Sequence, residues 1–248
     1  MACRIRRTAE WTKRILDETE GKPSCFLTLT YNIENIPSDL SLKKADLQKF
    51  FKRFRFHIKK QKIKYFACGE YGDKSSLPHY HMIIVGWKPP LEDLIYINKN
   101  VMSSRTIEKI WPFGFNTAGT VTKESCQYVT GYIRKKLYGK EDHYYPREKP
   151  FQLTSQNFGF DYAQKNWQRI LKGETVNGKN LGIPKYYIRK LGTTEDIEML
   201  TDLQLSKEAR MLENYLTYDD FLKDKNLDML RRDAEANSKE KVFMKSKI

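Results

Sequence analysis

The hydrophobic period of the first half of the chain changes from two to 3.6 and back to two, which limits the folds open to it. Ser24–Tyr31 (SCFLTLTY) alternates between two faces and predicts a strand. From Ser41 to about Gln61, hydrophobic residues at helical spacing predict an amphipathic helix with a basic outer surface. Tyr65–Tyr71 and His79–Trp87 predict two further strands, joined as a hairpin by a turn rich in Gly, Asp, Ser and Pro.

A second series of elements follows the hairpin. We expect a short helix over Ser103–Trp111, a strand over Phe115–Val121, and a helix that Thr122 caps and Gly139 ends. The complete order resembles a split β-α-β arrangement, as in ferredoxin-like and RRM-like folds. The pattern therefore predicts an α+β fold with an antiparallel sheet of about five strands and helices on one face only.

The length of 248 residues favours one globular core with an extension. We expect a basic N-terminal segment over residues 1–23 and the core over 24–140. An aromatic and basic extension over 141–192 would pack on the core or complete it. Residues 193–248 are expected to form a helical C-terminal extension that ends in a loose basic tail.

The charge balance favours a polyanionic partner, and nucleic acid first. Lys and Arg number 45 against 31 Asp and Glu, which gives a net charge of +14. The residues expected to contact DNA are Lys52, Lys59, Lys60 and Arg134. The four cysteines form no C-x-x-C pair, and no segment resembles a secretion signal or a membrane span, so a cytoplasmic protein without membrane contact is expected.

Two of the four histidines stand in an H-x-H pair on the predicted third strand. The period of a strand puts His79 and His81 on one face, where their imidazoles can share a metal ion. The hairpin brings Glu70 back beside them as a third ligand, which we prefer to Asp73 in the turn. Solvated surface positions are expected for the other two histidines, His57 and His143.

Two nitrogens and one oxygen leave coordination positions open for water and phosphate oxygens, which suits a catalytic rather than a structural ion. Mg²⁺ or Mn²⁺ is the expected cofactor, and Mn²⁺ accepts imidazole ligands more readily.

Tyr128 and Tyr132 are four residues apart, so that a helix stacks them one turn above the other. The hydrophobic stripe of this helix lies nearly opposite both tyrosines and consists of Cys126, Val129, Ile133 and Leu137. Lys135 and Lys136 lie on the side of the tyrosines. Because a phenol has a pKa of about 10, it attacks phosphorus only where cations favour the phenolate, and a metal ion with a lysine can do so.

Three segments in this order resemble the motifs of HUH endonucleases in rolling-circle replication initiators. They are FLTLTY at Phe26–Tyr31, PHYH at Pro78–His81 and YVTGYIRKK at Tyr128–Lys136. Together with WPFGF at Trp111–Phe115, the tyrosine pair resembles the initiators of the Microviridae, particularly the gokushovirus branch. Gly131 stands where that family often has a lysine, so Lys135 or Lys136 is expected to supply the assisting cation.

The resemblance implies a mechanism in which His79, His81 and an acidic residue bind the ion and one tyrosine cuts single-stranded DNA at the origin. The enzyme would stay attached to the 5′ end, while the free 3′-hydroxyl primes synthesis. The second tyrosine would later cut the regenerated origin, and the displaced strand would be closed into a circle. No G-x-x-x-x-G-K-[ST] motif is present, so a host helicase and host replication proteins are expected partners in the bacterial cytoplasm.

Three alternatives stay open at the level of the sequence. A non-catalytic module that binds single-stranded DNA would account for the charge and the aromatic residues but leaves the H-x-H pair without a role. A phosphodiesterase that uses water as its nucleophile would keep the metal site. A plasmid initiator, relaxase or transposase would keep the metal strand and the nucleophile helix as well.

Overall fold

The computed structural model describes residues 2–59, 61–72, 75–98, 101–135, 144–173, 182–212 and several positions between 220 and 230. At residues 2–5, 132–135, 208, 211 and 212 it describes the backbone but not the side chains. The chain divides into two compact units, one formed by Trp11–Lys165 and the other by Met1–Glu10 with Asn166–Ile248.

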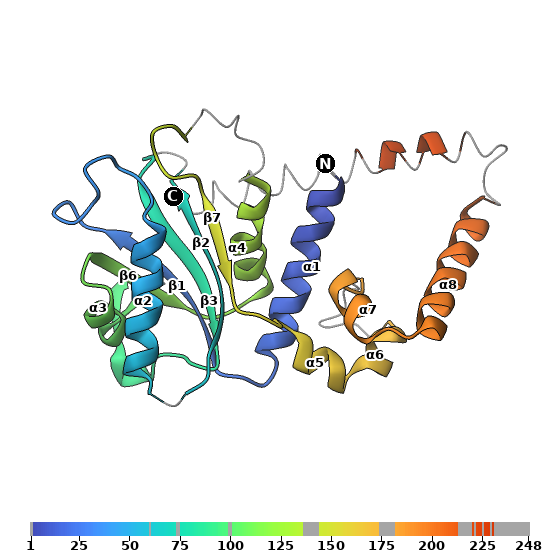
Figure 1. Ribbon diagram of the computed structural model, residues 1–248, viewed down its shortest axis with the longest axis horizontal. Coiled ribbons are helices and arrows are strands. Elements are labelled where there is room, and N and C mark those ends of the chain that lie inside the picture. The colour runs from blue at the N-terminus through green and yellow to red at the C-terminus, as the bar shows by residue number, and fades with distance from the viewer. Residues whose placement is uncertain are drawn as a thin grey trace. The chain divides into compact units, whose positions relative to one another are not determined.

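The first unit is built on one antiparallel sheet with the strand order β4-β5-β6-β1-β3-β2-β7 (Figure 1). The strands are β1 (Ser24–Tyr31), β2 (Lys64–Tyr71), β3 (Pro78–Val85), β4 (Leu94–Asn98), β5 (Val101–Ser104), β6 (Gly114–Gly119) and β7 (Phe151–Thr154). The α+β class is confirmed, but the prediction of about five strands is wrong, because the sheet has seven. The additional strands β4, β5 and β7 have only four or five residues each and lie at or near the edges.

Helices α2 (Lys44–His57) and α3 (Arg105–Ile110) cover one face of the sheet. The predicted hydrophobic stripe of α2 is buried there against the alternate residues of β1, as the periodicity indicates. The largest contributors to this core are Leu27, Leu29, Phe50, Phe51, Phe54, Tyr80 and Trp111. The short helix α3 starts at Ser104, whose hydroxyl accepts a hydrogen bond from the backbone N–H of Ile107.

Helices also cover the other face, so the prediction of helices on one face only is wrong. Helix α4 (Lys123–Lys135) packs there beside the part of α1 (Ala2–Thr19) that begins at Trp11. Their buried residues contact the second set of alternate residues in β2 and β3, and this smaller core contains Ile15, Phe66, Cys68, Ile83, Val85, Cys126, Val129 and Phe158. Strands β2 and β3 are hydrophobic on both faces, so both faces need a cover.

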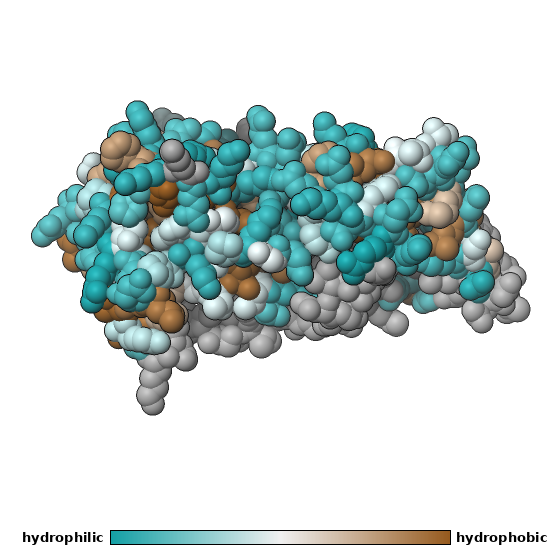
Figure 2. All heavy atoms as spheres, turned by 90° about the horizontal axis from the view of Figure 1, so that it is seen from below, coloured by the Kyte–Doolittle hydropathy of each residue, from teal (hydrophilic) through white to brown (hydrophobic). Residues whose placement is uncertain are grey.

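The remaining described elements are helical. Helix α5 (Phe160–Lys165) ends the first unit, and the second unit contains α6 (Trp167–Leu171), α7 (Lys185–Leu191) and α8 (Thr194–Leu212). The helix predicted from Thr194 is therefore present, whereas α7 was not predicted. Figure 2 shows one face of the molecule, on which hydrophilic residues cover most of the described surface. Among the described residues, no helix combines the length and the hydrophobicity that crossing a membrane requires.

Candidate metal centre

The hairpin of β2 and β3 brings the three predicted ligands together. In the antiparallel register Glu70 lies opposite His79, and Cys68 lies opposite His81. Because paired residues and every second residue share a face of the sheet, both imidazoles and the Glu70 carboxylate project from the same face. Tyr80, between the histidines, points into the core on the other face, as the alternation predicts.

The ligand atoms converge on one small volume. The Oε1 atom of Glu70 lies 2.9 Å from Nε2 of His79 and 3.1 Å from Nε2 of His81. One ligand atom from each of the three residues lies within 4.8 Å of the other two. Two ligands at about 2.1 Å from one ion and at right angles are about 3 Å apart, so these separations fit a shared ion. Glu70 and His81 are buried, and His79 is partly buried.

The outer nitrogens of the histidines fix which atoms face the ion. His79 donates from Nδ1 to the backbone carbonyl of Leu77 at 3.1 Å, and Nδ1 of His81 lies 2.9 Å from Oγ1 of Thr28. A carbonyl can only accept, so the neutral His79 ring directs its Nε2 lone pair at the carboxylate. Two lone pairs in contact repel each other unless a cation lies between them.

The carboxylate supports the same conclusion. Oε2 of Glu70 is buried without a hydrogen-bond partner among the described residues. A buried, unpaired carboxylate oxygen is costly, and a metal ion offsets that cost. The group of Glu70, His79 and His81 can therefore hold a metal ion. The alternative ligand Asp73 lies outside the described residues.

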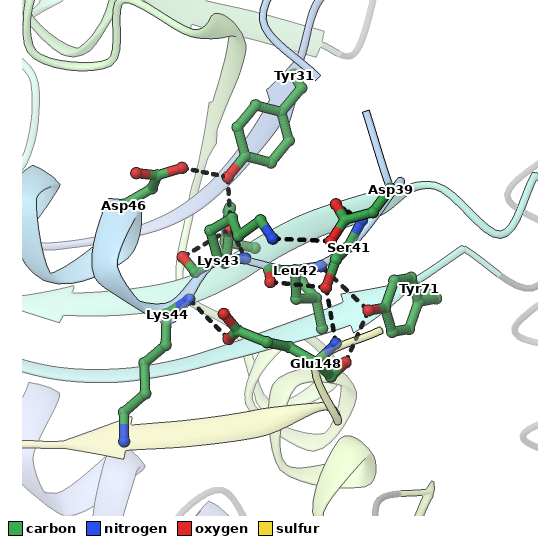
Figure 3. A network of polar contacts seen from close by, with 10 residues as sticks. Tyr31, Asp39, Ser41, Leu42, Lys43, Lys44, Asp46, Tyr71 and Glu148 are labelled. Carbon is green, nitrogen blue, oxygen red and sulfur yellow. Dashed lines mark hydrogen bonds and ion pairs between the residues drawn. The ribbon is translucent and has the colours of Figure 1, made fainter. Parts of the chain in front are cut away.

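A network of polar contacts on the opposite face holds the ligand strands in place (Figure 3). Tyr71, next to Glu70, accepts a hydrogen bond from the Leu42 backbone N–H and donates to the Glu148 carbonyl at 2.7 Å. The Tyr80 hydroxyl donates to the Lys43 carbonyl and contacts the Tyr31 hydroxyl at 2.7 Å. Burial raises the pKa of Tyr80 to about 12. The neighbours of all three ligands are thus anchored, which limits the movement of the ligands themselves.

Helix α4 brings one of the two predicted tyrosines to this centre. The Tyr128 hydroxyl lies 3.2 Å from Nε2 of His81, and the Tyr128 ring packs edge-on against the rings of His81 and Phe26. The sequence predicted that Tyr128 faces away from the packed side of its helix. Instead, Tyr128 is half-buried beside that side, because its long side chain reaches the sheet next to Val129.

The other predicted site residues are distributed unevenly. Helix α4 includes Tyr132, Arg134 and Lys135 in its backbone, but their side chains are not described. Two others, Lys60 and Lys136, lie outside the described residues, as does His143. Lys52 and Lys59 are exposed on α2 and directly after it, on the layer that covers the face opposite the histidines. The structure does not bring these two lysines to the metal centre. His57 is exposed at the end of α2, as expected.

Thr28 and the Leu77 carbonyl are functional groups that the sequence reasoning missed. Thr28 belongs to the FLTLTY segment, and the register of β1 with β3 places it opposite His81. A second signal was available, because a polar residue among the hydrophobic residues of a central strand requires a partner. The position of that partner depends on the pairing of β1 with β3, which the sequence alone does not specify.

Comparison with known proteins gives the family. Residues 24–137 match the family model for replication-associated protein ORF2. The chain is 32% identical over 241 residues to replication-associated protein ORF2 of Spiroplasma virus 4, covering 87% of this chain and 73% of that relative. The chain belongs to this family of phage replication-associated proteins. The predicted resemblance to initiators of the Microviridae type is thereby confirmed.

Two further phage relatives of this replication-associated protein have similar identities. Replication-associated protein ORF4 of Chlamydia phage 1 is 31% identical, covering 79% of this chain and 53% of the relative. Replication-associated protein VP4 of Bdellovibrio phage phiMH2K is 32% identical, covering 75% of this chain and 63% of the relative. The chain therefore spans between half and two thirds of the length of these two relatives. No solved structure matches the chain significantly.

Proposed function

We propose that this replication-associated protein is an endonuclease that nicks single-stranded DNA at an origin by metal-dependent tyrosine transesterification. One observation carries the proposal: the Tyr128 hydroxyl lies 3.2 Å from a nitrogen that belongs to the group able to hold a metal ion. A phenol has no structural need for that position. As a nucleophile, it requires a cation beside it.

The residues would divide the reaction between them. His79, His81 and Glu70 hold Mg²⁺ or Mn²⁺, and the ion polarises the scissile phosphate and offsets its developing charge. The phenolic oxygen of Tyr128 or Tyr132 forms a bond to phosphorus, and the bond from phosphorus to the 3′ oxygen breaks. The phenolic proton ends on that oxygen as a 3′-hydroxyl. Lys135 or Lys136 supplies a second cation.

The covalent intermediate defines the biological role. A 5′-phosphotyrosine conserves the energy of the phosphodiester, so the same chemistry in reverse rejoins the displaced strand into a circle without ATP. The free 3′-hydroxyl primes rolling-circle synthesis. A helicase and the replication machinery of the bacterial host would act beside it in the cytoplasm, and Arg134, Lys52, Lys59 and Lys60 would contact the DNA backbone.

Transfer of a labelled strand to the protein tests the proposal. Oligonucleotides that tile the origin region of the encoding genome carry a 3′ label, because the protein would retain the strand on the 3′ side of the nick. We expect a Mn²⁺- or Mg²⁺-dependent label on the protein in a denaturing gel, absent with EDTA and absent from the Tyr128→Phe/Tyr132→Phe double variant. Tyr96→Phe, which alters an exposed tyrosine on β4, is the matched control.

Two other results would each contradict the proposal. Cleavage without label on the protein would identify water as the nucleophile. Binding without cleavage of any tiled oligonucleotide would favour the non-catalytic binding module.

A further inference from the structure

The WPFGF segment holds three aromatic side chains, and the fold uses only two of them in its core. Trp111 is fully buried and donates from Nε1 to the Thr30 carbonyl at 2.9 Å. Phe113 packs against the rings of Trp111 and Tyr31. Phe115 is 66% exposed near the start of β6. Packing therefore accounts for Trp111 and Phe113 but not for Phe115.

Gly114 fixes where Phe115 stands. A Cβ atom at Gly114 would lie 2.3 Å from the Thr30 carbonyl oxygen, so only glycine permits this close approach of β6 to β1. The approach sets the register in which Phe115 lies opposite Thr30.

The register aligns Phe115 with the metal centre. Phe115 pairs with Thr30, and Thr30 pairs with His79 on the next strand. Paired residues share a face, so Phe115, Thr30 and His79 form one row across the sheet, spanning two strand spacings or about 10 Å. Only the short side chain of Thr30 separates the exposed ring from the metal ligand, a distance that one nucleotide can bridge.

We propose that Phe115 is a stacking platform for one base of the single-stranded DNA, beside the nucleotide whose phosphate occupies the metal centre. The proposal rests on the proposed function. A single exposed hydrophobic side chain is ordinary, but this one lies on the face and in the row of the candidate ligands. An aromatic ring stacks on any base, and the chain's charge of +14 favours the strand's phosphates. The platform would therefore hold the strand without selecting its sequence.

Binding in the absence of metal tests the platform separately from nicking. The full chain is titrated into fluorescein-labelled, mixed-sequence single-stranded DNA in EDTA, and anisotropy gives the Kd. Phe115→Ala and Phe115→Leu should weaken binding about 5- to 150-fold, whereas Phe115→Trp should bind as the wild type. Phe56→Ala is the matched control, because Phe56 is 87% exposed on α2, which covers the opposite face.

The leucine and tryptophan variants separate stacking from folding. Phe115→Leu keeps a hydrophobic side chain, and unchanged thermal midpoints would show that each variant folds. Wild-type affinity in Phe115→Ala or Phe115→Leu, or no binding of single-stranded DNA by the wild type, would overturn the platform.

A second titration tests the location of the stacked base. In the oligonucleotide that is nicked, removal of one base beside the nicked bond should weaken binding by the wild type but not weaken binding by Phe115→Ala further. Additive losses at every position around the nick would overturn this placement. Platform and nicking can fail separately: unchanged binding by Phe115→Ala with label transfer intact refutes the platform alone, and ring-dependent binding without label transfer refutes nicking alone.

Discussion

Replacement of Thr28 by valine should weaken metal binding while leaving the metal-free protein almost unchanged. Valine keeps the shape and β-branching of threonine, so strand β1 retains its packing. It removes the hydroxyl that lies 2.9 Å from Nδ1 of His81. A His81 ring that presents Nε2 to an ion must carry its proton on Nδ1, and in the variant that proton has no acceptor on Thr28.

The magnitude follows from the difference between the two states. Without metal, His81 can move its proton to Nε2, which lies 3.1 Å from the Glu70 carboxylate, so the loss of the Thr28 hydroxyl costs little. With metal bound, this tautomer is closed to it, and a buried N–H without an acceptor costs about 1–3 kcal/mol. This cost corresponds to a metal affinity about 5- to 150-fold weaker, in the range found for outer partners of metal ligands.

Isothermal titration of Mn²⁺ into the metal-free protein measures the effect, with the thermal midpoint in EDTA as the control for folding. Thr28→Ser restores the hydroxyl and should recover most of the affinity. The reasoning would be refuted by a Thr28→Val variant that binds Mn²⁺ as tightly as the wild type, or by equal losses in the serine and valine variants.

The remaining predictions concern the nucleophile, the ligand set, the core and a buried phenol. Tyr128→Phe and Tyr132→Phe should each retain some label transfer, so complete loss in one single variant would show that the tyrosines are not interchangeable. Glu70→Gln should weaken Mn²⁺ binding in calorimetry by more than Thr28→Val does, since it removes a ligand charge; an unchanged affinity would exclude Glu70. Phe50→Ala should lower the free energy of unfolding in urea by about 3–5 kcal/mol, because Phe50 is fully buried under the sheet; a loss under about 1 kcal/mol would contradict this packing. Burial raises the pKa of Tyr80 to about 12, whereas an unfolded tyrosine ionises near pH 10, so Tyr80 should contribute stability below pH 10 that is lost as pH rises from about 10 to 12. A difference between wild type and Tyr80→Phe that does not change over that pH range would argue against it.

The central elements were predictable because their hydrophobic periods are strong. Strand β1 begins and ends where the alternation of SCFLTLTY does, and the stripe of α2 is buried as its spacing indicates. The short strands β4, β5 and β7 carry no such pattern. Strand β4 leaves Tyr96 and Ile97 exposed, so it exists through its pairing with β5 rather than through burial of its own side chains.

Helix α1 was missed because buried polar residues interrupt its hydrophobic stripe. Ile15 is fully buried, but Lys13 and Asp17 are buried beside it as an ion pair one helical turn apart. Glu18 is buried as well and accepts hydrogen bonds from Lys64 and from the backbone of Gly159. A helix whose polar residues are satisfied by distant partners reads as a basic surface segment until those partners are known.

The metal ligands were predictable for a local reason, since a hairpin fixes which residues of its two strands lie opposite each other. Glu70 and His79 are such a pair. The contacts of Thr28 and Tyr128 with His81 depend instead on how β1 and α4 pack against the hairpin. Tertiary packing decides those contacts, and a period read from the sequence contains no information about it.

Mapping the residue that carries the DNA tests the central claim most directly. The protein is incubated with the nicked oligonucleotide and Mn²⁺, digested with protease and nuclease, and its peptides are analysed by mass spectrometry. The account predicts a nucleotide attached through its 5′ phosphate to Tyr128 or Tyr132, and no adduct when EDTA is present. Attachment to a residue outside α4, or nicked DNA with no modified peptide, would contradict it.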